Sequence, residues 1–307
     1  MVYEVKLSGV EQDNGRIELH RLALLAQSIK DIASGALRLR LIGVSTERGR
    51  KSDRILNAAS IHLADLKKGS TILELECDTF RETLEGQQGD AFNAEILHEL
   101  PDQTPMTLVM ESFREALNYK EDNSHLDKGL LKKLKTFEKI FISGDESVIF
   151  TNRGSLPDLT LKQTDFKKIK ELEESIPESQ EIIINGIVDE LKYSKSRITI
   201  ATEEGAVTGI LSDTIDPEEI SKFWGKRLTI SGRSHFQPNG RMSFIYIDKF
   251  FEPSEADRYF SKISRKETVE QQIQRQQKLL KYNNNLNEIV GKWPGDEDID
   301  EILNALD

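Results

Sequence analysis

The stretch Ile182-Ile-Ile-Asn-Gly-Ile-Val188 opens a series of five short apolar runs that decides the fold of the second half of the chain. It reads as a β-strand with a glycine inside it, where a bend or a close approach of another backbone is expected. Arg197-Ile-Thr-Ile-Ala201 and Ala206-Val-Thr-Gly-Ile-Leu211 follow, separated by the turn Glu203-Glu-Gly205. Arg227-Leu-Thr-Ile-Ser-Gly232 and Met242-Ser-Phe-Ile-Tyr-Ile247 complete the series, so we expect five strands.

One helix interrupts the series between its third and fourth strands. Asp216-Pro-Glu-Glu219 supplies a capping residue, a proline in the first turn and two acids, and the helix is expected to run to about Trp224-Gly225. Phe223 and Trp224, at its end, are expected to belong to the core. Three strands, a helix and two strands over about 70 residues is the order of an OB-fold. Residues 181–253 therefore resemble the small OB modules of nucleic-acid enzymes.

This resemblance implies a surface for oligonucleotides on the loops that join strands 1–2 and 4–5. Cations there would hold phosphate and rings would stack on bases. The alternative is a pair of ordinary solvated loops around an aromatic plug, because residues 182–252 carry nine Lys/Arg against ten Asp/Glu and are near neutral. The candidate nucleic-acid-binding residues are Lys192, Tyr193, Lys195, Arg197, Arg233, His235, Phe236 and Arg241.

Residues 1–176 mix strands and helices without a βαβ rhythm, which predicts an α+β domain. We expect strands at residues 3–7 and 16–19 around an Asp13-Asn-Gly15 turn, and a hairpin at residues 61–76. Cys77, which ends this hairpin, is expected to be a small buried hydrophobe. Residues 82–104 look like a loop. Helices are expected at residues 22–36, 106–117, 126–140 and 164–176, and short strands at 147–150 and 159–161.

Composition narrows the function classes. With 307 residues two domains are expected, and no apolar run is long enough for a membrane span. The start of the sequence lacks a secretory signal, so a cytoplasmic protein is expected. A single cysteine and five scattered histidines predict neither a disulfide nor a metal site, and no cofactor is expected. The net charge of −11 argues against a surface that coats nucleic acid throughout and fits a basic partner.

Residues 254–307 form the third region, where we expect a helical tail. A helix is expected over residues 254–263, and a polar, Gln-rich helix over residues 267–280. Residues 286–307, which we call the acidic segment, then place Trp293 in a turn and carry six acids and no base from Asp296 to Asp307. An apolar stripe at helical spacing follows Trp293, and a helix this short needs a surface to lie on. The candidate partner-binding residues are Trp293, Ile299, Ile302, Leu303 and Leu306.

The acidic segment resembles the C-terminal peptides of antitoxins that neutralise PIN-domain ribonucleases. Many of these end in a Gly-x-Trp, a short acidic turn and a Glu-Glu-Ile/Leu helix. The resemblance implies docking on a PIN-type ribonuclease. The matching positions are Gly291, Trp293, Gly295, Asp296, Glu297, Glu301, Ile302 and Leu303.

The sequence departs from that family in two ways. Antitoxins of this kind are usually small proteins with a DNA-binding fold before the peptide, whereas the segment here begins at Leu286 and no helix-turn-helix signature precedes it. Lys292 is its only cation, so docking is favoured over the plugging of an acidic active site. Self-packing of the segment is the structural alternative.

Three function classes remain open. No phosphate-binding glycine loop, nucleophile elbow or zinc-peptidase spacing occurs, so a non-enzyme is expected. The favoured function is an antitoxin-like binding protein. The alternatives are a single-stranded nucleic-acid-binding accessory protein and a hydrolase whose acids carry no recognisable motif.

Overall fold

The computed structural model describes residues 1–9, 16–46, 53–67, 71–84, 98, 100–120, 125–152, 154, 156–192, 196–212, 214–237, 240–262, 272–273 and 276–277. Residues Met1–Lys266 form one compact unit and Glu267–Asp307 a second. The described part contains both helices and strands, including a closed five-stranded barrel, which confirms the α+β class.

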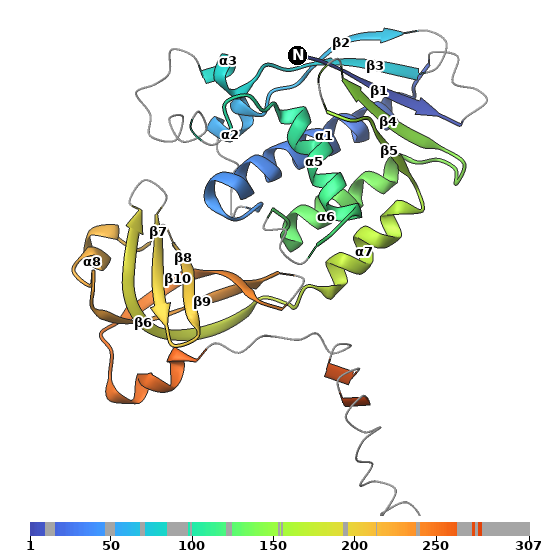
Figure 1. Ribbon diagram of the computed structural model, residues 1–307. Helices are drawn as coiled ribbons and strands as arrows, with labels where there is room; N and C mark the ends of the chain where they lie inside the picture. The colour runs from blue at the N-terminus through green and yellow to red at the C-terminus, as the bar shows by residue number, and fades with distance from the viewer. Residues whose placement is uncertain are drawn as a thin grey trace, which may run out of the picture. The chain divides into compact units, whose positions relative to one another are not determined.

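A five-stranded sheet organises the first part of the compact unit. Its order is β2-β3-β1-β4-β5 (Figure 1). The strands are β1 (Val2–Ser8), β2 (His62–Lys67), β3 (Thr71–Glu76), β4 (Ser147–Asn152) and β5 (Leu159–Lys162). Every neighbouring pair is antiparallel. β1, β3, β4 and β5 alternate between buried and more accessible residues, because one face of the sheet carries the helices.

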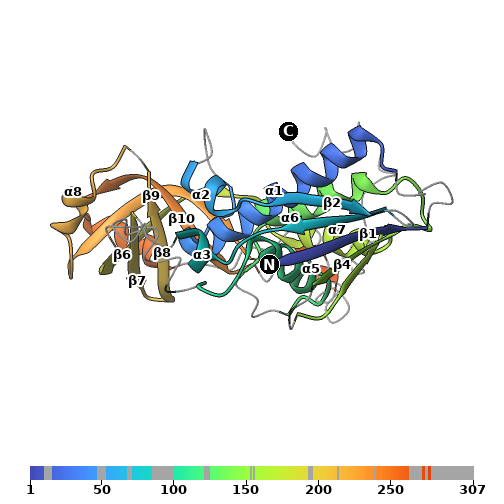
Figure 2. The same ribbon diagram turned by 90° about the horizontal axis from the view of Figure 1, so that it is seen from above.

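Figures 1 and 2 show the helices gathered on one face of this sheet. The longest are α1 (Leu19–Ile42), α5 (Pro105–Leu117) and α7 (Asp165–Ser175). α6 (Lys128–Thr136) continues into the 3₁₀ turn η1 (Phe137–Ile140), and α2 (Asp53–Ala58) and α3 (Phe80–Leu84) are short. α5 begins at a reciprocal capping box, in which Thr104 Oγ1 and Thr107 Oγ1 each accept the other residue's backbone N–H.

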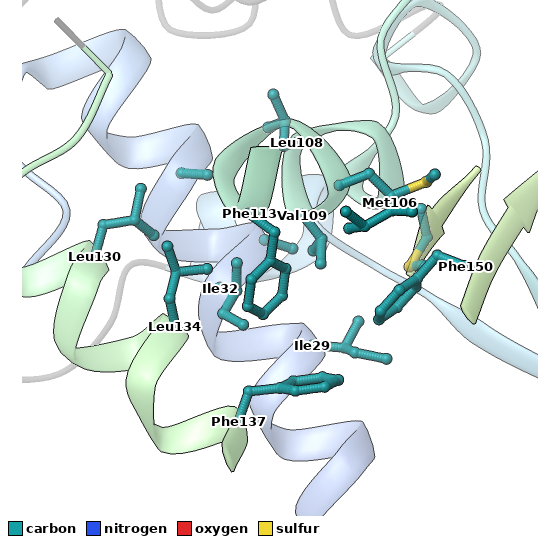
Figure 3. Close-up of a cluster of buried hydrophobic side chains, with 14 of the residues drawn as sticks. Ile29, Ile32, Met106, Leu108, Val109, Phe113, Leu130, Leu134, Phe137 and Phe150 are labelled. Atoms are coloured by element: carbon teal, nitrogen blue, oxygen red, sulfur yellow. The ribbon is translucent and has the colours of Figure 1, made fainter. Parts of the chain in front are cut away.

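Phenylalanine rings fill the space between these helices and the sheet. Phe113 of α5 meets Phe137 edge-on, with ring centroids 5.2 Å apart, and lies 6.4 Å from Phe150 of β4. Figure 3 shows Ile29 and Ile32 of α1 beside these rings, and Leu130 and Leu134 of α6 nearby. All seven side chains belong to one buried cluster, so α1, α5, α6 and the sheet share a single core.

One expected strand is absent from the sheet. Residues 16–19 were expected to pair with residues 3–7, but Leu19 begins α1, and β1 pairs with β3 and β4 instead. The hairpin at residues 61–76 is confirmed as β2–β3, and the helices expected at 106–117 and 164–176 are confirmed as α5 and α7. The helix expected at 22–36 is longer, as α1, and the one expected at 126–140 is divided into α6 and η1. Cys77 is buried, as expected. Burial raises the pKa of its thiol, so it stays protonated and behaves as a small apolar side chain.

The second part of the compact unit is the closed barrel, ordered β10-β8-β7-β6-β9. Its strands are β6 (Gln180–Lys192), β7 (Arg197–Thr202), β8 (Gly205–Leu211), β9 (Arg227–Phe236) and β10 (Met242–Phe251). β8 and β10 pair in parallel and close the barrel. The helix α8 (Pro217–Ser221) lies between the third and fourth strands, and its N-cap is Asp216 as expected. The barrel is compatible with the OB-like fold that the sequence predicts.

Two glycines permit close contacts in the barrel wall. A Cβ at Gly186 would lie 2.5 Å from the Ala201 carbonyl oxygen of β7, so the close backbone approach expected from the sequence is confirmed. A Cβ at Gly232 in β9 would overlap the Tyr246 carbonyl oxygen of β10. Because backbone atoms cannot swing aside as side chains can, both strands require glycine at these positions.

We predict that Gly232→Ala lowers the free energy of unfolding by about 3 kcal/mol, the upper end of the usual cost of overpacking. Gly144→Ala is the matched control, because its Cβ would have nothing closer than 3.8 Å and should change stability little. Urea unfolding of both variants measures the difference. Equal stability of the two variants would show that the β9–β10 contact tolerates a methyl group.

Candidate binding surfaces

The structure describes six of the eight loop residues expected to bind nucleic acid. Tyr193 and Lys195 lie outside the described residues. Lys192 is exposed, with its Nζ 3.6 Å from Glu190. Arg197 donates to Thr208 Oγ1 at 3.2 Å, and Arg233 is exposed and paired with Glu181 at 3.0 Å. Arg241 is exposed. Of these described cations, Lys192 and Arg233 are paired with acids of the same barrel.

The two aromatic residues near the β9–β10 loop are engaged inside the molecule. Phe236 is 5 % exposed and belongs to the same buried cluster as the core around Phe113. His235 stacks on Phe244 with ring centroids 4.4 Å apart, and lies 3.3 Å from the hydroxyl of Ser179. Phe244 in turn is buried with Val44 and Ile210. The ring of Phe236 is not accessible to a base in this structure, which agrees with the plug alternative.

Trp224 was expected in the barrel core, and this expectation is wrong: 69 % of the residue is exposed. It follows α8 directly and lies beside β6, where it bridges Val188. Its neighbour Phe223 is half-buried and packs with the barrel core instead. The sequence shows two consecutive aromatics at a helix end, but it does not show which of them turns inward.

A chain of hydrogen bonds attaches the 3₁₀ helix η3 (Glu255–Ser261), which follows β10, to the barrel. It starts at Asn185 of β6, which is 1 % exposed, lies between the exposed Ile183 and Ile187, and donates to Thr229 Oγ1 at 2.9 Å. Thr229 donates to Asp257 of η3. The backbone N–H of Ser254 and this hydroxyl hold the pKa of Asp257 below its usual value. This chain of bonds fastens η3 to β6 and β9 and explains the buried asparagine.

A cavity of about 450 Å³ lies in the first part of the unit, between α1 and the β2–β3 edge of the sheet. Its walls include Leu22, Ala26 and Ile29 from α1 and Leu63 and Leu75 from the hairpin. Leu63 is half exposed because no described helix covers β2. The sequence patterns predict α1 and the hairpin, but they do not predict a cavity between them, because its size depends on how α1 packs on the sheet.

The remaining shifted titratable groups have structural partners. Burial raises the pKa of Tyr3, which hydrogen-bonds to Thr104 at 2.8 Å. Lys67 bonds to Glu4 and Glu74, which raises its pKa. Hydrogen bonds from Thr79 lower the pKa of Glu82, and Lys128 lowers the pKa of Glu178.

Within the described residues, no group of three or more His, Cys, Asp or Glu could hold a metal ion. Over the same residues, no helix is long and apolar enough to cross a membrane.

The residues of the acidic segment, Trp293, Ile299, Ile302, Leu303 and Leu306, lie outside the described residues. Of the expected Gln-rich helix, only Gln272, Ile273, Gln276 and Gln277 are described, and all four are helical. Comparison with protein-family models, curated proteins and solved structures finds no match to this chain.

We predict that Phe236→Ala lowers the free energy of unfolding by about 3–5 kcal/mol, because it empties a buried ring site. Phe251→Ala, on the neighbouring strand, is the control: this residue is 49 % exposed and should cost far less. Thermal and urea unfolding compare the two variants. If Phe236→Ala kept wild-type stability, the buried ring would contribute little to the fold, and its role as a plug would be excluded.

Proposed function

We propose that this protein binds and neutralises a protein partner through the acidic segment, and that the partner is a PIN-type ribonuclease. The observation that carries the proposal is the pattern of residues 291–307. Trp293 stands before a short apolar stripe on a stretch with six acids and no base. A helix with this pattern is suited to lie in an apolar groove rimmed by cations.

The charge of the chain supports a basic partner. The formal net charge is −11, and the acidic segment concentrates negative charge around its apolar stripe. Complementary charge speeds association and sets orientation more than it adds to final affinity. The energetic centre of such an interface is a buried aromatic side chain, here Trp293.

The pKa shifts of the described residues bear on the hydrolase alternative. The groups with shifted pKa, among them Tyr3, Cys77 and Asp257, are accounted for by burial or by hydrogen bonds within the fold. A catalytic assignment would draw on shifted groups that the fold does not explain. These groups therefore give no reason to prefer the hydrolase alternative.

The second candidate function is the binding of single-stranded nucleic acid by the barrel. The closed five-stranded barrel favours it, since barrels of this kind host such surfaces. The burial of Phe236 argues against a base stacking on this ring beside the β9–β10 loop.

We predict that deleting residues 292–307 leaves the melting temperature of the compact unit nearly unchanged but abolishes complex formation with the partner. Trp293→Ala should weaken the complex by 2 kcal/mol or more, since it removes the anchor. The test uses purified PIN-domain ribonucleases as probes, with complex formation followed by size-exclusion chromatography and inhibition followed by RNA cleavage. Tyr259→Ala, an aromatic residue that is 85 % exposed on η3, is the matched control and should bind normally. A melting temperature lowered by several degrees, with unchanged binding, would assign the segment to self-packing.

Neutralising Asp300 and Glu301 with Asn and Gln should slow association and flatten its salt dependence, while dissociation changes less. Stopped-flow measurement of both rate constants at two salt concentrations checks this. The control is Glu171→Gln together with Glu174→Gln, which removes acids from the exposed surface of α7. Equal slowing in both variants would point to overall charge and not to the acidic segment.

A further inference from the structure

The turn between α8 and β9 directs two consecutive aromatic residues in opposite directions. Phe223 packs against Phe250, with ring centroids 6.0 Å apart at an angle of 71°, and so belongs to the barrel interior. Trp224 exposes its ring instead. Large apolar rings in soluble domains are usually well buried, so an exposed tryptophan beside an anchored phenylalanine is a candidate contact residue.

The indole ring is fixed in place. Its Nε1–H donates to the Asp189 carbonyl oxygen at 3.1 Å, so the polar edge of the ring is satisfied by the protein. The backbone below it is held by Trp224 N–H to Ser221 at 3.1 Å and by Gly225 N–H to Val188 at 2.9 Å. Gly225 has φ +71°, which suits glycine in this tight turn. An aromatic platform that is already ordered loses little conformational entropy when a ligand stacks on it.

Cations surround this ring along the chain. Lys222, Lys226 and Arg227 lie within three residues of Trp224, and all are exposed. Arg227 donates to Asn185 Oδ1 at 2.9 Å, which ties it to β6. Among the acids near this turn, Asp189 meets the indole through its backbone carbonyl and Glu190 pairs with Lys192. Glu218 and Glu219 of α8 are exposed. A ring and several cations in one short turn provide stacking for a base and charge for phosphate.

We propose that Trp224, Lys222 and Lys226, the Trp224 surface, bind single-stranded nucleic acid by stacking a base on the indole. The flanking cations favour a polyanion over a protein partner. This surface is separate from the loops that the OB resemblance implies. The inference rests on the second candidate function and names a site for it, and the acidic segment takes no part in it.

The test uses the full chain and a fluorescein-labelled 15-nucleotide oligo-dT or oligo-U at low salt. We expect a rise in anisotropy and quenching of tryptophan fluorescence. Trp224→Ala should weaken binding about tenfold or more and remove the quenching, as expected for the loss of one stacked base. The quenching should persist in Trp293→Phe, which separates this surface from the acidic segment.

Two further variants sharpen the result. Lys222→Ala with Lys226→Ala should reduce the slope of log affinity against log salt by about 1.4, from two lost phosphate contacts on a single strand. Tyr259→Ala should bind like the wild type. No anisotropy change for wild type at low salt, or equal affinity of Trp224→Ala, would overturn the proposal. So would loss of a protein complex in Trp224→Ala without loss of oligonucleotide binding. If Trp224→Ala fails to fold, quenching in Trp293→Phe decides, because Trp224 is then the remaining tryptophan of the chain.

Discussion

Helix α1 packs in the core of the first part of the compact unit, and Ile42 at its end packs against a small apolar cluster that includes barrel residues. Its buried face, which includes Ile29, Ile32 and Leu37, packs in the core that contains the phenylalanine rings of α5, η1 and β4. The helix ends at Gly43 in the left-handed conformation, and just beyond it Val44 is buried with Ile210 and Phe244 of the barrel. The polar start of the helix is fixed as well, since the buried Arg21 donates to Glu146 and to the Ile140 carbonyl. A shift of α1 would therefore disturb the sheet core and a barrel contact together.

Periodicity was sufficient to predict most of these elements. The alternation in residues 61–76 gave the hairpin, and the three-four spacing from Leu22 gave α1, because each pattern matches a surface with one buried face. The strand expected at residues 16–19 failed because a four-residue alternation fits the start of a helix equally well. Pairing partners from residues 71–76 and 147–152 occupy both edges of β1, so no edge was left for that strand.

The candidate sites were harder to predict, for a reason that Phe236 and Trp224 share. Each is an aromatic residue at the end of an element, and the local sequence does not say whether a ring at such a position meets solvent or another part of the fold. Phe236 is covered through contacts distant in sequence, while Trp224 is turned outward by the bonds of its own turn. Tertiary contacts, which a single sequence does not display, decided both outcomes. The hypothesis that the acidic segment binds a partner rests on its residue pattern alone.

The exposed outer side of β2 has a consequence for association between copies of the chain. No described strand pairs with the outer side of β2, and its residues are mostly exposed, including Leu63 and Leu66. Such an edge is a template for a strand of another molecule. The register shift between Leu63 and Asp65 bends the strand, and Asp65 and Lys67 place charge along it. Strand addition at this edge is thus opposed by an irregular backbone and by the charge of Asp65, whereas Lys67 is held by Glu4 and Glu74 within the sheet. Neutralising Asp65 should therefore favour association between copies more than it changes folding stability.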